Sequence, residues 1–447
     1  MTIDWDRRVR SDAPYYVALG QRGQSWDDFL SGGEDLVRGL EKELVRIGTP
    51  AGELRRALEI GCGPGRLMLP LSRHFAEIHG VDVSAGMVRL AERNLAGVAH
   101  AHIHASDGTN LGQFRDEFFD FVYSFAVFQH IPSREVVLNY LRETRRVLKT
   151  RGIAKLQFNG LAGGSGKYDT WSGVRFQANE IAEFARRHDL QLMALEGVGT
   201  QYMWGTFCKP PAGWRQALQS EATHLAIRRV TNASSAEAVV PARGRHAAFA
   251  LWLERLPSHA DLNTLRVQVG GREARLTSIG TPQADGLQQV TMMMPLGLST
   301  GFQPFRLTCA ETSIACEGFI HVIPPGPEVP RVASVSDSVC VGAGRAISSN
   351  MVRVSLEESR RPGDLRAAVD GRPMRRVSLV CSVPDIPRFE IDFRLPFGVS
   401  AGKKNLECWL GRRYLGATGI DVAADRFWWW RLLHPAEVYQ ALRRFLW

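Results

Sequence analysis

Short apolar runs alternate with helix-length amphipathic segments over residues 1–210. The expected strands are residues 57–60, 76–83, 98–106, 118–125, 153–158, 190–196 and 202–208. Helices are expected at residues 84–97, 133–149 and 178–188, and Ser84 and Ser133 stand where the first two need N-caps. This alternation is typical of a parallel sheet wrapped by helices, so we predict an α/β domain at the amino-terminal end.

The pattern changes after residue 246, where short strands with alternating apolar residues are separated by Gly and Pro turns. This part of the chain also repeats itself, because LRVQVGGR at 265–272 and LRAAVDGR at 365–372 share five of eight residues. Two strand-rich copies of about 90 residues predict two small β-sandwiches in tandem. The sequence IPPGPEVP at 323–330 is expected to form a stiff joint between them.

These patterns predict five segments along the chain. They are the α/β domain at 1–210, a linker with one helical stretch at 211–246, a first sandwich at 247–326, a second sandwich at 327–424 and an amphipathic aromatic tail at 425–447. The tail contains Trp428, Trp429 and Trp430 together with four arginines. Packing on the chain itself, a protein partner and peripheral contact with a membrane surface all remain open for such a segment.

Composition and charge narrow the class of protein. The chain has 447 residues, of which 45% are hydrophobic and 23% charged, which is ordinary for a folded protein of several domains. The net charge is +9, and the arginines are scattered along the chain. This distribution favours a solvated surface over a nucleic-acid groove. Seven cysteines without a C-x-x-C pair, a charged amino terminus and no run of 18 apolar residues predict a cytoplasmic protein without a membrane span.

The sharpest motif is LEIGCGPGR at 58–66, directly after an expected strand. Gly61, Gly63 and Gly65 allow the backbone to turn tightly and to approach a ligand without a Cβ, and the amides of the following helix point to the same place. A nicotinamide-dinucleotide fingerprint needs a glycine at position 66, where this chain has Arg66. A glycine loop alone is also compatible with a plain strand-turn-helix connection.

Carboxylates follow the next two expected strands. Asp82 comes 21 residues after Gly61, at a position where a carboxylate accepts both hydroxyls of a ribose in dinucleotide folds. Asp107 follows the third strand, where a carboxylate can accept a hydrogen bond from an adenine amino group. The glycine loop, a ribose acid and an adenine acid therefore come in order at successive strand ends.

This order resembles the class I S-adenosylmethionine-dependent methyltransferases, in particular the small-molecule branch called type 11. The matching motifs are EIGCGPG at 59–65, VDVS at 81–84, SDG at 106–108, F-D-x-V-x-S at 119–124 and VFQHI at 127–131. The resemblance covers residues 40–210. It implies a Rossmann-like, doubly wound sheet of seven strands whose last strand is antiparallel.

The resemblance also implies S-adenosylmethionine as the cofactor. The loop glycines would flank its methionine part, Asp82 its ribose and Asp107 its adenine, with Ser124 and Phe125 near the sulfonium. The cofactor-binding residues implied in this way are Glu59, Gly61, Cys62, Gly63, Gly65, Asp82, Val83, Asp107, Gly108, Ser124 and Phe125.

The implied reaction is in-line transfer of a methyl group to an O, N or C nucleophile. Because a positive sulfur is already a good leaving group, the protein mainly has to align donor and acceptor in a dry pocket, with a base where the acceptor loses a proton. His130, just beyond the fourth strand, is the candidate catalytic base, and the alternative is that it caps or packs the next helix. The N-P-P-Y and D-P-P-Y tetrapeptides of nucleic-acid N-methyltransferases are missing, which disfavours a nucleic-acid substrate. We expect a small-molecule or saccharide acceptor, the saccharide because of the modular layout and the aromatic tail.

The histidines at 100, 102 and 104 alternate along one expected strand. Residues four apart in a strand are separated by about 13 Å. One zinc ion with bonds of about 2 Å cannot join all three, so we predict no metal site there.

The repeats at 248–324 and 331–424 resemble bacterial immunoglobulin-like modules of the IPT/TIG kind through phrases such as VGGR, GLQQV and PLGLSTG. Such modules are spacers or bind carbohydrate or protein. The alternative function is therefore a catalytically silent, cofactor-binding scaffold whose sandwiches bind a glycan or a protein partner. A nicotinamide oxidoreductase is disfavoured by Arg66.

Overall fold

The computed structural model describes residues 2–18, 25–31, 33–48, 54–161, 168, 170, 173–221, 225–309, 315–326, 329–338, 346–347, 350–383 and 388–423. The described residues form two compact units, the first mainly from residues 2–17 and 25–326 and the second mainly from residues 329–381 and 388–423. The predicted tail at 425–447 lies outside the described residues. No helix among the described residues combines the length and the apolar character that crossing a membrane requires.

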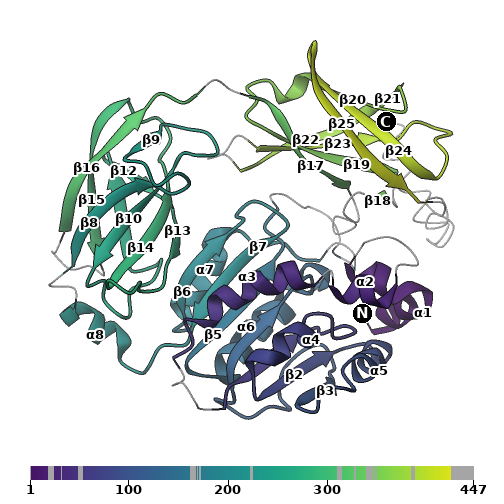
Figure 1. Cartoon of the computed structure of the whole chain (residues 1–447), viewed down its shortest axis with the longest axis horizontal. Helices are drawn as coiled ribbons and strands as arrows, with labels where there is room; N and C mark the ends of the chain where they lie inside the picture. Colours follow the sequence, from purple (N-terminus) through teal and green to yellow (C-terminus); the bar gives the residue numbers. More distant parts are fainter. Residues whose placement is uncertain are drawn as a thin grey trace. The chain divides into compact units, whose positions relative to one another are not determined.

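The amino-terminal part of the first unit contains a sheet in the strand order β3-β2-β1-β4-β5-β7-β6. Figure 1 labels β2, β3, β5, β6 and β7 of this sheet. Neighbouring strands from β3 to β5 are parallel, and β7 runs antiparallel to both β5 and β6. The predicted Rossmann-like α/β domain is therefore confirmed. The strands are β1 (Arg56–Ile60), β2 (Glu77–Asp82), β3 (Ala101–Ala105), β4 (Phe119–Ser124), β5 (Leu148–Phe158), β6 (Gln191–Glu196) and β7 (Met203–Cys208).

Helices cover both faces of this sheet. One face packs its apolar residues against α6 and α7, and the other packs against α3 and α4. Ser84 and Ser133 are the predicted N-caps, since their hydroxyls accept from the amides of Met87 and Val136. The helices are α1 (Thr2–Ala18), α2 (Trp26–Ser31), α3 (Glu34–Leu44), α4 (Met68–Leu71), α5 (Ala85–Asn94), α6 (Arg134–Val147) and α7 (Ala178–Arg187).

The sheet does not stop at the seven strands that the resemblance implied. Strand β6 is followed by four more strands, which makes an eleven-stranded sheet. They are, in order, β13 (Leu276–Ile279), β14 (Leu287–Met293), β10 (Ala248–Glu254) and β8 (Ala226–Asn232). The junction is held by pairing of Ala194 with Ser278 and by Asp261, whose carboxylate accepts from the amide of Leu192 at 3.0 Å. The physical reason is that a strand at the edge of a sheet exposes unpaired backbone groups, and here the following β region pairs with them.

The remainder of the first unit is largely β. Its strands form the outer part of the eleven-stranded sheet and a second sheet in the order β12-β11-β15-β16-β9, and the two share one apolar core. The strands are β8 (Ala226–Asn232), β9 (Val239–Pro241), β10 (Ala248–Glu254), β11 (Leu265–Val269), β12 (Arg272–Ala274), β13 (Leu276–Ile279), β14 (Leu287–Met293), β15 (Gly301–Cys309) and β16 (Ala315–Ile323).

The segment predicted as a linker, 211–246, contains regular structure. The sequence predicts a helical stretch near residues 214–229, whereas the structure has helix α8 (Trp214–Glu221) followed by β8 and β9. Strand β8 pairs with β10 along its length, so the tertiary pairing decides the conformation of residues that resemble a helix locally. The β region of the first unit thus includes strands that the predicted boundary at 247 left out.

The second unit repeats the arrangement of the β region in the first unit. Its sheets have the orders β17-β19-β23-β22 and β18-β25-β24-β20-β21 around one apolar core, and these orders match β8-β10-β14-β13 and β9-β16-β15-β11-β12 strand for strand. The strands are β17 (Arg331–Asp337), β18 (Ala346–Ile347), β19 (Met351–Glu357), β20 (Leu365–Val369), β21 (Arg372–Pro373), β22 (Arg375–Val383), β23 (Arg388–Arg394), β24 (Gly402–Leu410) and β25 (Arg413–Val422).

Candidate cofactor and active site

The glycine loop lies at the carboxyl end of β1, where the order of the sheet changes direction between β1 and β4. Gly61, Gly63 and Gly65 have φ of 72°, 52° and 82°, a region that only glycine adopts readily. A Cβ on Gly61 would lie 2.3 Å from Cγ2 of Val127, in the segment after β4. A residue with a side chain at position 61 would therefore not fit against the segment after β4. The loop lies at the switch point of the sheet, which is where open α/β sheets bind ligands.

Asp82 fixes this loop from the end of β2. Its carboxylate accepts from the amide of Gly63 at 2.9 Å and from the amide of Ser84 at 2.8 Å. Burial raises the pKa of Asp82 to about 6, against the opposing effect of the amides of Ser84, Gly63 and Val83. Each carboxylate oxygen has a further lone pair, so Asp82 can hold the loop and still accept a hydroxyl donor.

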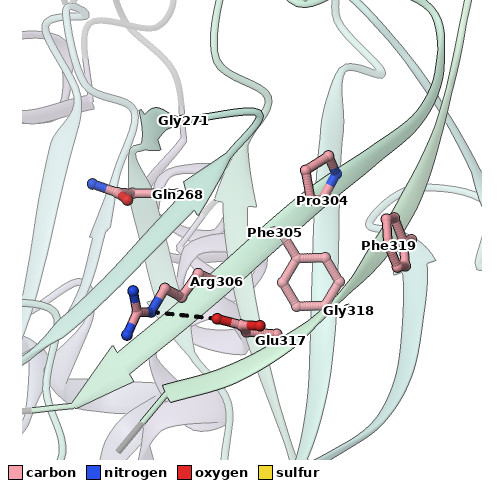
Figure 2. Close-up of a pocket in the computed structure, with 8 residues that line it drawn as sticks. All are labelled: Gln268, Gly271, Pro304, Phe305, Arg306, Glu317, Gly318 and Phe319. Atoms are coloured by element: carbon pink, nitrogen blue, oxygen red, sulfur yellow. Dashed lines mark ion pairs between the residues drawn. The ribbon is translucent and has the colours of Figure 1, made fainter. Parts of the chain in front are cut away.

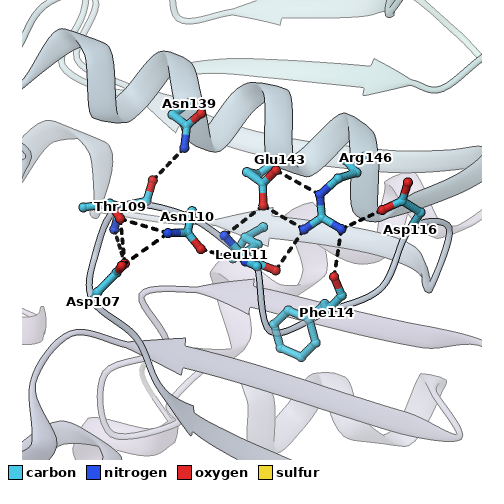
Figure 3. Close-up of polar contacts among 10 residues, drawn as sticks. Asp107, Thr109, Asn110, Leu111, Phe114, Asp116, Asn139, Glu143 and Arg146 are labelled. Atoms are coloured by element: carbon cyan, nitrogen blue, oxygen red, sulfur yellow. Dashed lines mark hydrogen bonds and ion pairs between the residues drawn. The ribbon is translucent and has the colours of Figure 1, made fainter.

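Asp107 begins the loop after β3 and is exposed (Figure 3). It accepts from the amide and the hydroxyl of Thr109, both at 2.8 Å, and from Nδ2 of Asn110 at 3.2 Å. The Thr109 contacts lower the pKa of Asp107, so its carboxylate is ionised at neutral pH. Gly108 follows with φ of 80°, and its amide donates to the hydroxyl of Ser106.

Helix α6 holds the rest of this loop in place. Figure 3 shows Asn139, Glu143 and Arg146 of α6 bonded to the loop backbone. The guanidinium of Arg146 donates to the carbonyl oxygens of Phe114 at 2.8 Å and Leu111 at 3.0 Å. A loop fixed by backbone contacts of this kind presents Asp107 in one conformation.

The end of β4 lies beside the glycine loop and completes the candidate cofactor site. Ser124 is fully buried, and its hydroxyl donates to the carbonyl oxygen of Ile60, which ties β4 to β1 beside the glycine loop. Phe125 is half-buried and stacks on Trp204 at a ring-centroid distance of 5.5 Å. The next residue, Ala126, has φ of 56°, and its amide donates to Oε1 of Gln157. A non-glycine residue in this conformation is strained, as is common at functional sites.

His130 is buried, at 7% exposure, in the short helical turn after β4. Its Nδ1 lies 3.1 Å from the carbonyl oxygen of Thr170, so Nδ1 carries a proton and donates it. Its Nε2 lies 3.3 Å from Nε2 of Gln129, and the ring of Trp5 packs on it at a centroid distance of 5.4 Å. Both nitrogens thus have partners within the protein, and a catalytic role for His130 stays a prediction.

Two of the predicted cofactor residues point into the protein. Glu59 is 3% exposed and accepts from the hydroxyl of Tyr123 at 3.0 Å, and burial raises its pKa well above the usual range. Cys62 is 4% exposed, and its backbone amide donates to the carbonyl oxygen of Val81. The side chains of Glu59 and Cys62 therefore pack below the loop. The loop glycines, Asp82, Val83 and Asp107 lie at the carboxyl edge of the sheet.

Residues 58–156 match the family model described as a methyltransferase domain. This part of the chain is a class I S-adenosylmethionine-dependent methyltransferase domain. The ubiquinone biosynthesis O-methyltransferase of Ruegeria sp. (strain TM1040) is 32% identical over 102 residues, which cover 22% of this chain and 38% of that protein. The trans-aconitate 2-methyltransferase of Rhodopseudomonas palustris (strain BisB18) is 31% identical over 137 residues, which cover 30% of this chain and 49% of that protein. The chain thus spans less than half the length of these curated relatives.

A similar fold occurs in a solved structure of phosphoethanolamine N-methyltransferase 1 from Haemonchus contortus, bound to phosphoethanolamine and S-adenosylhomocysteine. The match has 16% sequence identity and a TM-score of 0.37, and it covers 47% of this chain and 48% of that one.

The methyltransferase domain contains site residues that the sequence analysis missed, and α1 supplies one of them. Asp6 accepts from the hydroxyl of Ser84 at 2.5 Å and from the amide of Gly86 at 3.3 Å, so it caps α5 together with Ser84. Val9 and Val17 of the same helix lie closest to the positions where a Cβ on Gly86 and on Gly63 would stand. Helix α1 therefore covers the glycine loop.

A cluster of glutamines also lies behind the end of β4. Nε2 of Gln157 donates to the carbonyl oxygen of Gln201 at 2.7 Å, and Nε2 of Gln201 donates to Oε1 of Gln129 at 3.1 Å. All three side chains are buried. The sequence signal for these glutamines is weak, because Gln157 is one of two polar residues in the strand 153–158 and Gln129 is one of two within the VFQHI motif.

Proposed function

We propose that this protein is an enzyme that transfers a methyl group from S-adenosylmethionine to an O, N or C nucleophile of a small-molecule or saccharide acceptor. The observation that carries the proposal is the glycine loop at the switch point of the sheet, closed by Asp82 through the amide of Gly63. The methyltransferase family match over residues 58–156 supports the same reaction class.

The residues present fit the cofactor. The loop glycines leave an edge of backbone without side chains, Asp82 offers acceptors for ribose hydroxyls, and Asp107 offers an acceptor for the adenine amino group. When bound, S-adenosylmethionine supplies a methyl group on a positive sulfur. The chain's own task is to hold both reactants in line and to keep water out, for which α1 over the loop and the ring of Phe125 are well placed.

An oxygen nucleophile agrees best with the relatives. One curated relative is named as an O-methyltransferase of ubiquinone biosynthesis and another as a 2-methyltransferase of trans-aconitate, and both names point to small molecules. A carboxylate acceptor needs no base, whereas a hydroxyl acceptor gives up a proton. His130 can take part only with an acceptor that displaces Gln129 from its Nε2.

The β regions are proposed to be immunoglobulin-like modules that hold part of a larger acceptor, such as a saccharide. A hollow of 380 Å³ on the outer face of β11, β15 and β16 supports this role (Figure 2). It contains the ring of Phe319, which is 67% exposed, beside an ion pair of Arg306 with Glu317 and the amide of Gln268. An exposed ring next to polar groups suits a ligand that has one apolar and one polar face.

The test is turnover with a panel of acceptors, including phenols, carboxylic acids, amines and oligosaccharides. Release of S-adenosylhomocysteine is measured for the wild type, for Asp82→Asn and for Gly97→Ala, whose added Cβ would meet no atom within 4 Å. We expect acceptor-dependent release by the wild type and Gly97→Ala, and a large loss in Asp82→Asn. Absence of turnover with every class, despite cofactor binding, would contradict the enzyme proposal.

The second candidate function is a cofactor-binding scaffold without turnover. It is favoured by one observation, namely that both ring nitrogens of His130 have partners in the protein. In that case the Phe319→Ser variant would lose binding to immobilised glycans while S-adenosylhomocysteine binding stays unchanged. An enzyme would instead show a raised KM for a saccharide acceptor in the same variant.

A further inference from the structure

A cluster of imidazoles and one carboxylate lies between β2 and β3, away from the cofactor residues. One ligand atom each from Glu77, His79 and His102 lies within 4.8 Å of the other two. The parallel register places His79 directly beside His102, with ring centroids 4.7 Å apart. Pairing of the two neighbouring strands therefore brings together ligand atoms that would lie too far apart along a single strand.

The spacing of these atoms suits a small transition-metal ion. Zinc bonds to imidazole nitrogen and carboxylate oxygen are about 2.0–2.2 Å long, so tetrahedral ligand atoms lie about 3.3–3.5 Å apart. Oε2 of Glu77 and Nε2 of His79 are already 3.4 Å apart. His102 is exposed on the edge strand, so its ring can move by the remaining distance without disturbing the core.

Neighbouring side chains orient the ligand atoms of the cluster. Nδ1 of His79 lies 3.1 Å from Nε2 of His104, a hydrogen bond that directs Nε2 of His79 toward Glu77. Arg56 pairs with Glu77 at 2.9 Å and fixes the orientation of its carboxylate. Such contacts of metal-ligating histidines and carboxylates set the tautomer and the direction of the ligands.

The cluster is partly shielded from water. His79 is 7% exposed, and Phe118 and Phe119 pack edge-on against its ring at 5.6 and 5.3 Å. Three nitrogen and oxygen donors beside an apolar wall, with an opening at His102, leave the remaining coordination position for water. We propose that Glu77, His79 and His102 bind a divalent first-row transition-metal ion such as Zn²⁺.

This site is separate from the methyltransferase chemistry. Glu77 begins β2 and Asp82 ends it, so the two lie about 16 Å apart along the strand. The two imidazoles and one carboxylate favour Zn²⁺, Ni²⁺ or Cu²⁺ over Mg²⁺ and Ca²⁺, which prefer oxygen ligands alone. An ion there would fasten the edge strand β3 to its neighbour β2.

The experiment is calorimetric titration of the untagged, EDTA-stripped full chain with ZnCl₂. His102→Ala removes an exposed ligand, and His100→Ala is the matched control, because His100 contacts the carbonyl oxygen of Ser72 instead of the cluster. We expect the wild type and His100→Ala to bind one more Zn²⁺ than His102→Ala does. Glu77→Gln is expected to bind that ion at least about tenfold more weakly.

Visible absorption of the Co²⁺-loaded protein gives a second readout, since bands of a low-coordinate site should appear in the wild type and be absent in His102→Ala. Circular dichroism in EDTA checks that His102→Ala is folded. Equal zinc stoichiometry and affinity in the wild type and His102→Ala would overturn the proposal. An equal loss in His100→Ala would do the same, and S-adenosylhomocysteine affinity that falls in His102→Ala would contradict the separation of the two sites.

Discussion

Replacing Gly61 with alanine is expected to destabilise the first unit strongly, because two separate costs fall on one added methyl group. The φ of Gly61 is 72°, and holding an L-residue there costs about 1–2 kcal/mol. The new Cβ would also lie 2.3 Å from Cγ2 and 2.8 Å from Cγ1 of Val127. Overpacking of this kind costs about 1–3 kcal/mol, so we expect the free energy of unfolding to fall by about 2–5 kcal/mol in total.

The assay is urea denaturation followed by tryptophan fluorescence, with a double-mutant cycle. Val127→Ala in the Gly61→Ala background removes the two Cγ contacts but leaves Cβ of residue 127 at 3.1 Å and the strain in φ. It should therefore recover about 1–2 kcal/mol. Gly97→Ala is the control and should lie within about 0.5 kcal/mol of the wild type, because its Cβ would meet no neighbouring atom. Gly61→Ala as stable as the wild type, or effects of the two substitutions that simply add, would refute the reasoning.

Three further predictions concern buried charge, pH and the loop after β3. Lys155→Met should lower the free energy of unfolding by about 2 kcal/mol, because buried Glu43 loses the ammonium 2.9 Å away and keeps the guanidinium of Arg46 at 2.6 Å. Adding Glu43→Gln should recover part of this loss in urea melts. The affinity for S-adenosylhomocysteine should be constant above pH 7 and fall as the pH drops through about 6, where Asp82 becomes protonated. Calorimetry from pH 5 to 8 measures this profile. A wild-type profile as flat as that of Asp82→Asn would contradict the prediction. Arg146→Ala should cost about 1–3 kcal/mol in urea melts and weaken cofactor binding, whereas the exposed Arg142→Ala should change neither.

Local signals made the α/β domain predictable from the sequence. Ser84 and Ser133 cap helices through contacts with residues three positions away, and each expected strand of the sheet has a counterpart in the structure. The glycine loop and Asp82 were predictable for the same reason, because a strand, a turn and a helix place them without reference to distant parts of the chain. The family match then agrees with the motif order.

Pairings between distant residues could not be predicted from these signals. The junction of Ala194 with Ser278 joins strands more than 80 residues apart, and it turns seven strands into eleven. The position of His79 beside His102 has the same origin, since a pattern along one strand says nothing about its neighbour. The cover that Asp6 provides over α5 is likewise a contact across 78 residues.

The most direct test of the account is calorimetric titration of the purified chain with S-adenosylhomocysteine, with Asp82→Asn and NADH as controls. The account predicts that the wild type binds one S-adenosylhomocysteine, that Asp82→Asn binds it at least about tenfold more weakly through loss of a charged acceptor, and that NADH gives no binding. A folded wild type that does not bind S-adenosylhomocysteine, or that prefers NADH, would contradict it.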